Sequence, residues 1–134
     1  MLLDHQDRIT VNPELFNKHV AQALEELPAE FRAKMENVEI IVEDFADDEM
    51  LESVGVNSPW YLLGLYVGVP ITQRSVFALD GLPERIYLFR RPIIRAAGRF
   101  ENVVHTIRDV LIHEVGHHFG FDDDKLAEMT GQDK

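Results

Sequence analysis

Residues 113–123 read His-Glu-Val-Gly-His-His-Phe-Gly-Phe-Asp-Asp, and no other segment of the chain indicates a chemistry as clearly. On a helix, His113 and His117 lie one turn apart on the same face, separated by about 6 Å along the axis. Both imidazoles can therefore reach a single metal ion. Glu114 lies beside that ion without having to bind it, where it could accept a proton from a metal-bound water. The segment predicts a helix that carries a metal site and a general base.

Gly120 follows His117 by three residues and suits the end of this helix, because glycine readily adopts the left-handed conformation that turns the chain back. Three carboxylates come next, those of Asp122, Asp123 and Asp124. A turn at Gly120 would bring one of them toward the open coordination position of the ion.

The segment from His113 to Asp123 resembles the extended zincin signature His-Glu-x-x-His-x-x-Gly-x-x-His/Asp, in the variant that has Asp as the third ligand. The small size of the chain and the position of the motif near the C-terminus are similar to a bacterial family of minimal zincin-like metallopeptidases. Residues 64–70 (GLYVGVP) and 86–92 (IYLFRRP) are also similar to segments of that family. The resemblance therefore covers about the last three-fifths of the chain, and only the metal motif in it is highly specific.

This resemblance implies a zinc metallopeptidase, with Zn²⁺ bound by His113, His117 and Asp123 and with Glu114 as the general base. Many larger relatives have His where Asp123 stands. A carboxylate donates more negative charge to the ion, which should make the bound water less acidic.

The chain has 134 residues and no cysteine, so we expect a single domain over residues 1–134 that needs no disulfide and has no thiolate metal site. Its first residues lack the pattern of a signal peptide, and no apolar stretch approaches the ~20 residues of a membrane span. We therefore expect a cytoplasmic protein with no membrane partner.

The net charge of −11 also argues against a nucleic acid partner, because such binding depends on basic groups that neutralise phosphates.

The basic residues are unevenly distributed. Seven of the thirteen fall between positions 74 and 108, in the segment that leads into the metal helix: Arg74, Arg85, Arg90, Arg91, Arg95, Arg99 and Arg108. This segment either forms a basic rim that faces the substrate or, as we favour, consists of ordinary solvated arginines.

Hydrophobic periodicity and turn residues predict an α+β domain, in which a small mixed sheet packs against helices that include the long metal-binding helix. We expect helices at residues 13–27, at about 28–36, from 99 or 100 to 119, and at about 124–129. Strands are expected at 38–43, 62–67 and 85–89, and a loop or short helix at the acidic stretch 44–52.

The metal helix also predicts where its polar residues lie. At 100° per residue, His113 and His117 are about 40° apart and fall at the border of a broad apolar face. Glu114 lies closer to the apolar side, where burial would make it a stronger base. His118 points into that face and is better interpreted as a packed core histidine than as a ligand. Asp109, one turn before His113, is either a solvated residue or the acceptor that orients the His113 ring.

Two glycine-containing segments are expected to lie near the site. Residues 64–68 (GLYVG) lack the pattern of a phosphate-binding loop and indicate a strand whose glycines allow close backbone contacts. Tyr66 and Tyr61 are weak candidates for a substrate contact. Gly116 costs helix stability, so another backbone, such as a strand beneath the helix, is expected to approach it closely.

Hydrolysis of a peptide or related amide bond is the reaction that this set of residues serves best. We expect a peptide or protein substrate, which an edge strand such as residues 85–89 could align by adding it to the sheet. Only eleven residues follow Asp123, so we also expect a shallow cleft. The activity on unstructured protein is then either weak or dependent on an unidentified protein partner.

Two other classes of function remain open. One is a non-catalytic, zinc-stabilised interaction module on the same scaffold. The other is a metal-dependent endoribonuclease of the small bacterial rRNA-maturation type, whose helix has a similar His-x-x-x-His pattern. That family lacks the Glu beside the first His and normally ends in His, and Glu114 together with the acidic net charge favours the peptidase.

Overall fold

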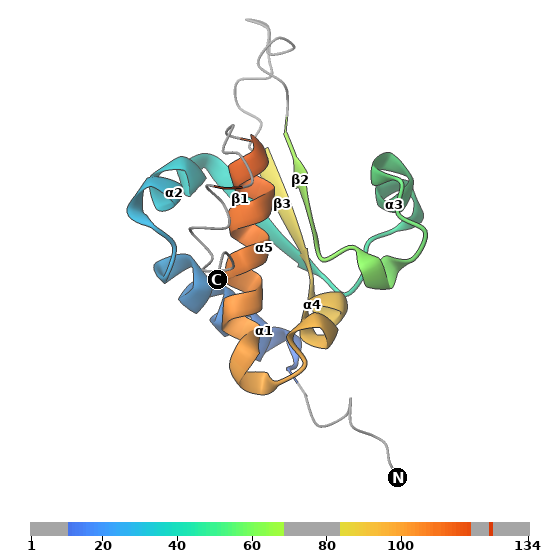
Figure 1. The fold of residues 1–134 in the computed structure, drawn as a ribbon, viewed down its shortest axis with the longest axis horizontal. Helices are drawn as coiled ribbons and strands as arrows, with labels where there is room; N and C mark the ends of the chain where they lie inside the picture. The colour runs from blue at the N-terminus through green and yellow to red at the C-terminus, as the bar shows by residue number, and fades with distance from the viewer. Residues whose placement is uncertain (1–10, 69–83, 119–123, 125–134) are drawn as a thin grey trace, which may run out of the picture.

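A computed structural model describes residues 11–68, 84–118 and 124 of the chain, apart from the side chains of His117 and His118. Five α-helices and three strands follow one another along these residues (Figure 1). In chain order they are α1 (Pro13–Glu25), α2 (Ala29–Lys34), β1 (Val38–Glu43), α3 (Asp48–Val54), β2 (Gly64–Val67), β3 (Glu84–Phe89), α4 (Arg90–Ala97) and α5 (Val103–His118). Short 3₁₀ turns at Met35–Asn37, Pro59–Tyr61 and Phe100–Asn102 precede β1, β2 and α5.

The three strands form one mixed sheet in the order β1-β3-β2. Strand β1 is parallel to β3, with Ile40 opposite Ile86, and β2 is antiparallel to β3, with Gly64 opposite Leu88. The predicted strand at 85–89 is therefore confirmed, but the expectation that it is an edge strand is wrong. Residues 86–89 of β3 form a continuous apolar run, which is the pattern of a strand covered on both faces. In the sheet formed by the described strands, β2 and β1 are the edges.

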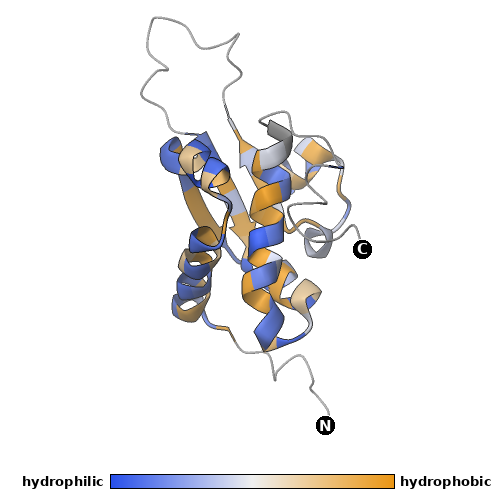
Figure 2. Ribbon diagram, turned by 60° about the vertical axis from the view of Figure 1, so that its left-hand side comes forward, coloured by the Kyte–Doolittle hydropathy of each residue, from blue (hydrophilic) through white to orange (hydrophobic). Residues whose placement is uncertain are grey.

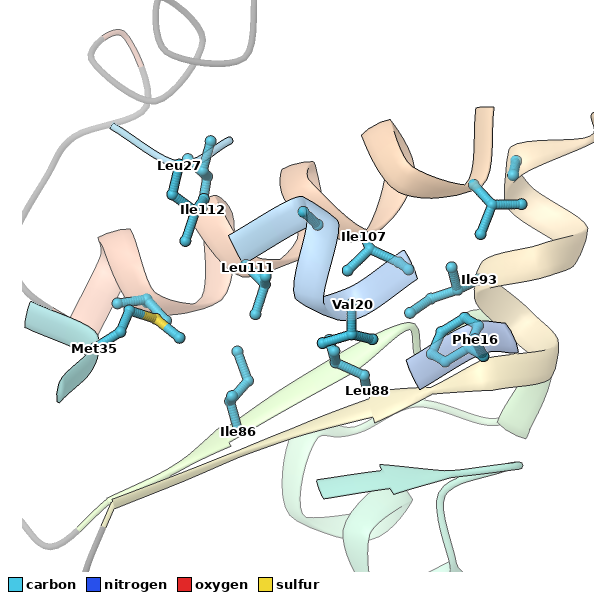
Figure 3. Close-up of a cluster of buried hydrophobic side chains, with 14 of the residues drawn as sticks. Phe16, Val20, Leu27, Met35, Ile86, Leu88, Ile93, Ile107, Leu111 and Ile112 are labelled. Atoms are coloured by element: carbon cyan, nitrogen blue, oxygen red, sulfur yellow. The ribbon is translucent and has the colours of Figure 1, made fainter. Parts of the chain in front are cut away.

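One face of the sheet packs against the helices and forms the main core. Ile86 and Leu88 project from β3 into this core, where they meet side chains from α1, α4 and α5 (Figure 3). Hydrophobic residues, orange in Figure 2, lie along the strands and along the sides of the helices that face the sheet. The largest side chains that are fully buried in this core are those of Phe16, Phe31, Ile86, Leu88, Ile93, Val103, Ile107, Leu111, Ile112 and Val115. This core fixes α5 across β2 and β3.

The opposite face of the sheet has a smaller cluster under α3. Phe89 is fully buried there and packs with Ala46 and Leu51. The acidic stretch 44–52, which was predicted as a loop or short helix, contains the start of α3. Asp47 caps this helix, because its side chain accepts a hydrogen bond from the Met50 amide at 2.8 Å. The helix ends at Gly55, whose φ of 72° is the left-handed conformation that favours glycine.

The N-terminal helices agree with their predicted signals. Asn12 caps α1 by accepting a hydrogen bond from the Leu15 amide at 2.8 Å, and Pro13 occupies the first helical position. The predicted short helix at 28–36 is present as α2 and the 3₁₀ turn that follows it. The last predicted helix, at 124–129, lies outside the described residues except for Asp124.

Helix α4 was not expected from the sequence. It begins at Arg90, directly after β3, so the chain passes from strand to helix without a loop. Arg90 is buried and ties this junction to two other segments. Its Nε donates to Asp44 Oδ1 at 2.8 Å, just after β1, and its Nη1 donates to the Val11 carbonyl at 2.7 Å, just before α1. No helix among the described residues is long and apolar enough to cross a membrane.

Candidate metal centre

Helix α5 carries His113, Glu114 and the backbone of His117 over its last two turns. A stripe of residues at helical spacing, consisting of Val103, Ile107, Leu111 and Val115, is fully buried and anchors the helix on the sheet. Phe100, one of the two expected starts of this helix, lies in the preceding 3₁₀ turn, is 51% exposed, and packs its ring edge-on against His19. His113 and Glu114 flank the buried stripe and are each half-buried, and for His113 this agrees with its predicted place at the border of the apolar face.

The His113 ring is held by the helix itself. Its Nδ1 lies 2.9 Å from the backbone carbonyl oxygen of Asp109, one turn earlier. A carbonyl oxygen only accepts hydrogen bonds, so Nδ1 must be the protonated nitrogen of the neutral ring, and Nε2 then has the lone pair. A metal-ligating histidine normally donates its other ring nitrogen in this way. The orientation of His113 therefore fits a ligand that would bind through Nε2.

We expected Asp109 to be either a solvated residue or the acceptor that orients the His113 ring. The acceptor that the structure gives His113 is the main-chain carbonyl of Asp109. The carboxylate instead accepts hydrogen bonds from the Arg108 guanidinium, with Nη2 at 3.2 Å. In a helix, a side chain can approach the backbone carbonyl four residues earlier whatever residue supplies that carbonyl. The sequence alone therefore did not indicate this hydrogen bond.

Glu114 lies on the side of α5 that faces the edge strand β2. A Cβ atom built on Gly64 would be 3.5 Å from Glu114 Cγ and only 2.6 Å from Val110 Cγ1. The aliphatic part of Glu114 therefore packs almost directly against the backbone of β2. The sequence predicted close backbone contacts for the glycines of this segment, and Gly64 confirms them. It did not indicate that the neighbour would be the candidate base.

The remaining ligand candidates are only partly described. His117 lies one turn after His113 in α5, so its backbone places both residues on the same face, but its side chain is outside the described atoms. Asp122 and Asp123 also lie outside the described residues, and Asp124 is exposed. Within the described side chains, no three potential ligands come together. The candidate zinc ligands remain His113, His117 and Asp123, and two nitrogens with one carboxylate is a set that suits zinc.

The described arginines between positions 85 and 108 are held in pairs with other side chains and are not gathered into a basic rim. Five of the six that are described are paired with carboxylates: Arg85 with Glu39, Arg90 and Arg91 with Asp44, Arg99 with Glu101, and Arg108 with Asp109. Arg95 lies over the Trp60 ring, 5.0 Å from its centroid. Arg74 is outside the described residues. These side chains mainly connect elements of the fold.

The two candidate tyrosines differ in their surroundings. Tyr61 is 71% exposed in the 3₁₀ turn before β2. Tyr66 lies on β2, on the face toward the core, and its hydroxyl is hydrogen-bonded to the Glu84 carboxylate. Tyr66 thus lies on the same face of β2 as Gly64, two residues further along.

The profile of a family described as zincin-like metallopeptidase matches residues 35–132, a range that extends from the 3₁₀ turn before β1 past the metal motif. No curated protein matches the chain.

Proposed function

Because the chain belongs to the zincin-like metallopeptidase family, we propose that it is a zinc-dependent peptidase in which Glu114 is the general base. The observation that carries this proposal is the position of Glu114, half-buried and packed between the metal helix and the edge strand of the sheet. A base at this place lies beside both the first metal ligand and the strand along which an extended peptide could bind.

The residues that would hold zinc are His113 through Nε2, His117 and Asp123. The bound ion would supply a Lewis acid for the substrate carbonyl and lower the pKa of a bound water. The Asp109 carbonyl keeps the His113 ring in the tautomer and orientation that this role requires.

Glu114 would move the proton of the reaction. Its carboxylate accepts a proton from the attacking water as the water oxygen forms a bond to the substrate carbonyl carbon. The same carboxyl group then gives that proton to the amide nitrogen as the C–N bond breaks, so the carboxylate is regenerated. Partial burial beside Val110 and the β2 backbone holds this side chain in place between the two transfers.

The substrate strand would pair with β2, which takes over the role that the sequence suggested for residues 85–89. The Phe89 amide donates to the Leu63 carbonyl at 2.9 Å, so Leu63, Leu65 and Val67 direct their backbone polar groups toward β3. By the alternation of an antiparallel ladder, the N–H and C=O groups of Gly64 and Tyr66 point the other way. They are the groups that would bind the backbone of an extended peptide, at the residue against which Glu114 packs.

A direct test compares the zinc-loaded protein with its Glu114→Gln variant on a mixture of unstructured peptides. We expect the wild type to cleave peptides and the variant to bind zinc equally well while its turnover falls by about 10²–10⁴-fold, the usual contribution of a general base. Glu101→Gln is the matched control, because Glu101 is exposed before α5 and distant along the chain from the motif. Zinc binding without cleavage by the wild type would instead favour a non-catalytic, zinc-stabilised module.

A further inference from the structure

The contact between β2 and α5 is closest at Gly64. A Cβ atom at this position would lie 2.6 Å from Val110 Cγ1 and 3.2 Å from the Tyr87 carbonyl oxygen. The first distance is shorter than real carbon atoms tolerate. Val110 cannot easily turn away, because a β-branched side chain in a helix has one strongly preferred rotamer. The Tyr87 oxygen belongs to the central strand and is fixed by the sheet. The space at Gly64 therefore sets how closely the helix approaches the edge strand.

A second glycine, Gly68, directly follows β2 and has a different neighbour. Gly64 and Tyr66 alternate along β2 and lie on the same face of the strand. A Cβ at Gly68 would meet the Tyr66 ring, with Cε1 at 2.7 Å, whereas a Cβ at Gly64 would meet Val110 and Glu114. The two glycines thus make room for different groups, and only Gly64 bears on the helix that carries the candidate base.

We propose that Gly64 is a positioning residue for Glu114, an inference that rests on the proposed peptidase function. Any side chain at position 64 must widen the gap between β2 and α5, because Val110 blocks the space. Glu114 lies one turn after Val110 and moves with it, away from the strand on which the peptide would bind. Catalysis is sensitive to such movements, since a misplacement of about 1 Å can cost on the order of 10²-fold in rate.

Alanine is the informative substitution at this position. Gly64→Ala retains the backbone N–H and C=O groups that point away from β3, so a peptide can still pair with the strand. It adds only the Cβ atom that meets Val110. We therefore expect kcat to fall by about 10–100-fold with little change in KM. A residue that merely stabilised the fold would not separate the two constants in this way.

The position of Glu114 can be measured without any activity. In ¹³C-labelled, zinc-loaded protein, we expect a nuclear Overhauser contact between the Gly64 α protons and the Glu114 γ protons. In Gly64→Ala, the contact from the α proton of residue 64 to these protons should weaken or disappear. Gly68→Ala is the matched control, because it adds the same atom just after β2, against the Tyr66 ring and not against α5, and should leave the Gly64–Glu114 contact unchanged. Val110→Ala in the Gly64→Ala background removes the blocking Cγ1 atom and should restore both the contact and most of kcat.

The outcomes separate this inference from the proposed function. If the contact is unchanged in Gly64→Ala, or if kcat falls without recovery in the double variant, Gly64 does not position Glu114. If the contact responds as expected but kcat in Gly64→Ala stays at the wild-type value, the positioning inference is also wrong. If the wild type cleaves no peptide but the contact still responds to the substitutions, the proposed peptidase function is wrong. Gly64 then sets the spacing between β2 and α5 but has no role in catalysis.

Discussion

Arg90 and Asp44 form an ion pair in which Nε lies 2.8 Å from Oδ1 and the arginine side chain is only 10% exposed. The pair joins the end of β1 to the start of α4, and the Arg90 contact with the Val11 carbonyl adds the segment before α1. Three segments that are distant along the chain therefore meet on one guanidinium group.

Removal of Arg90 should destabilise the fold strongly. Arg90→Ala leaves the Val11 carbonyl and the Asp44 carboxylate without this partner, and we expect a loss of about 2–4 kcal/mol in the free energy of unfolding, measured by urea denaturation. Arg91→Ala is the control. Arg91 is 52% exposed and lies 3.5 Å from the same carboxylate, so its removal should cost less than about 1 kcal/mol. Equal losses in the two variants would contradict the structural role of Arg90.

Asp44 should make stability depend on pH in strong acid. The hydrogen bond from Arg90 holds the pKa of Asp44 below its usual 3.8, against a smaller effect of burial, and the charges of Arg90 and Arg91 add to the lowering. The unfolded chain thus takes up this proton first. The stabilising contribution is complete above pH 3.8 and is lost as the pH falls through the lower pKa of the folded state. Asp44→Asn should be less stable than the wild type at pH 5, with a difference that shrinks toward pH 2 in urea titrations.

His19 should give a second dependence at milder pH. Burial lowers the pKa of His19 below 6.5, and its Nδ1 is buried without a hydrogen-bond partner in the described part of the protein. The unfolded state binds this proton more readily, so the contribution of His19 is complete above pH 6.5 and is lost as the pH falls below it. His19→Leu should reduce the slope of stability against pH between pH 7 and 5. His105→Leu, at a 64% exposed histidine near Glu26, should leave that slope in place.

The third zinc ligand can be assigned by substitution. We expect Asp123→Ala to weaken zinc binding by more than roughly tenfold, because even residues outside the ligand set contribute 10–100-fold to affinity. Asp122→Ala and Asp124→Ala should retain nearly full affinity. Calorimetric titration of zinc into the three apo proteins decides the question, and undiminished binding by Asp123→Ala would refute the assignment.

Chelation of zinc should leave the fold intact. The fully buried side chains of Phe16, Leu88, Ile93 and Ile107 form a core around the N-terminal half of α5, away from the metal motif (Figure 3). The apo protein should therefore keep its circular dichroism spectrum, unlike a zinc finger, whose small core needs the ion. Zinc at 100 times its Kd should still stabilise the protein by about 2.7 kcal/mol through mass action. Hydrogen exchange should locate this effect at residues 120–124 and beyond, and global loss of helix on chelation would show the metal to be structural.

The sequence predicted the elements that have strong local signals. Asn12 and Pro13 mark the start of α1, and the β-branched run at Val38–Glu43 forms β1 over the predicted residues. Helix α4 was missed because it follows β3 without a break and is only eight residues long. Pro92 in its first turn and Gly98 at its end, with a φ of 75°, were the available signals.

Features that depend on distant contacts could not be predicted in this way. The position of β3 between β1 and β2 follows from strand pairing, and no local pattern in residues 84–89 separates a central strand from a buried edge strand. The same limit applies to the site. The positions of His113 and Glu114 on α5 follow from helical spacing, whereas the packing of Glu114 against Gly64 depends on how the helix lies across the sheet.

His113 is oriented by a carbonyl of its own helix, and Glu114, the next residue, is oriented by a strand that lies 50 positions earlier in the chain. Under the proposed function, affinity for the ion and the rate of turnover therefore depend on different parts of the fold. Mutations that loosen the sheet would lower turnover without loss of the metal, so a protein of this lineage would be able to lose its activity and still bind zinc. Conversely, transplanting α5 onto a new scaffold would carry the orientation of His113 with it, whereas Glu114 would lose the strand that orients it.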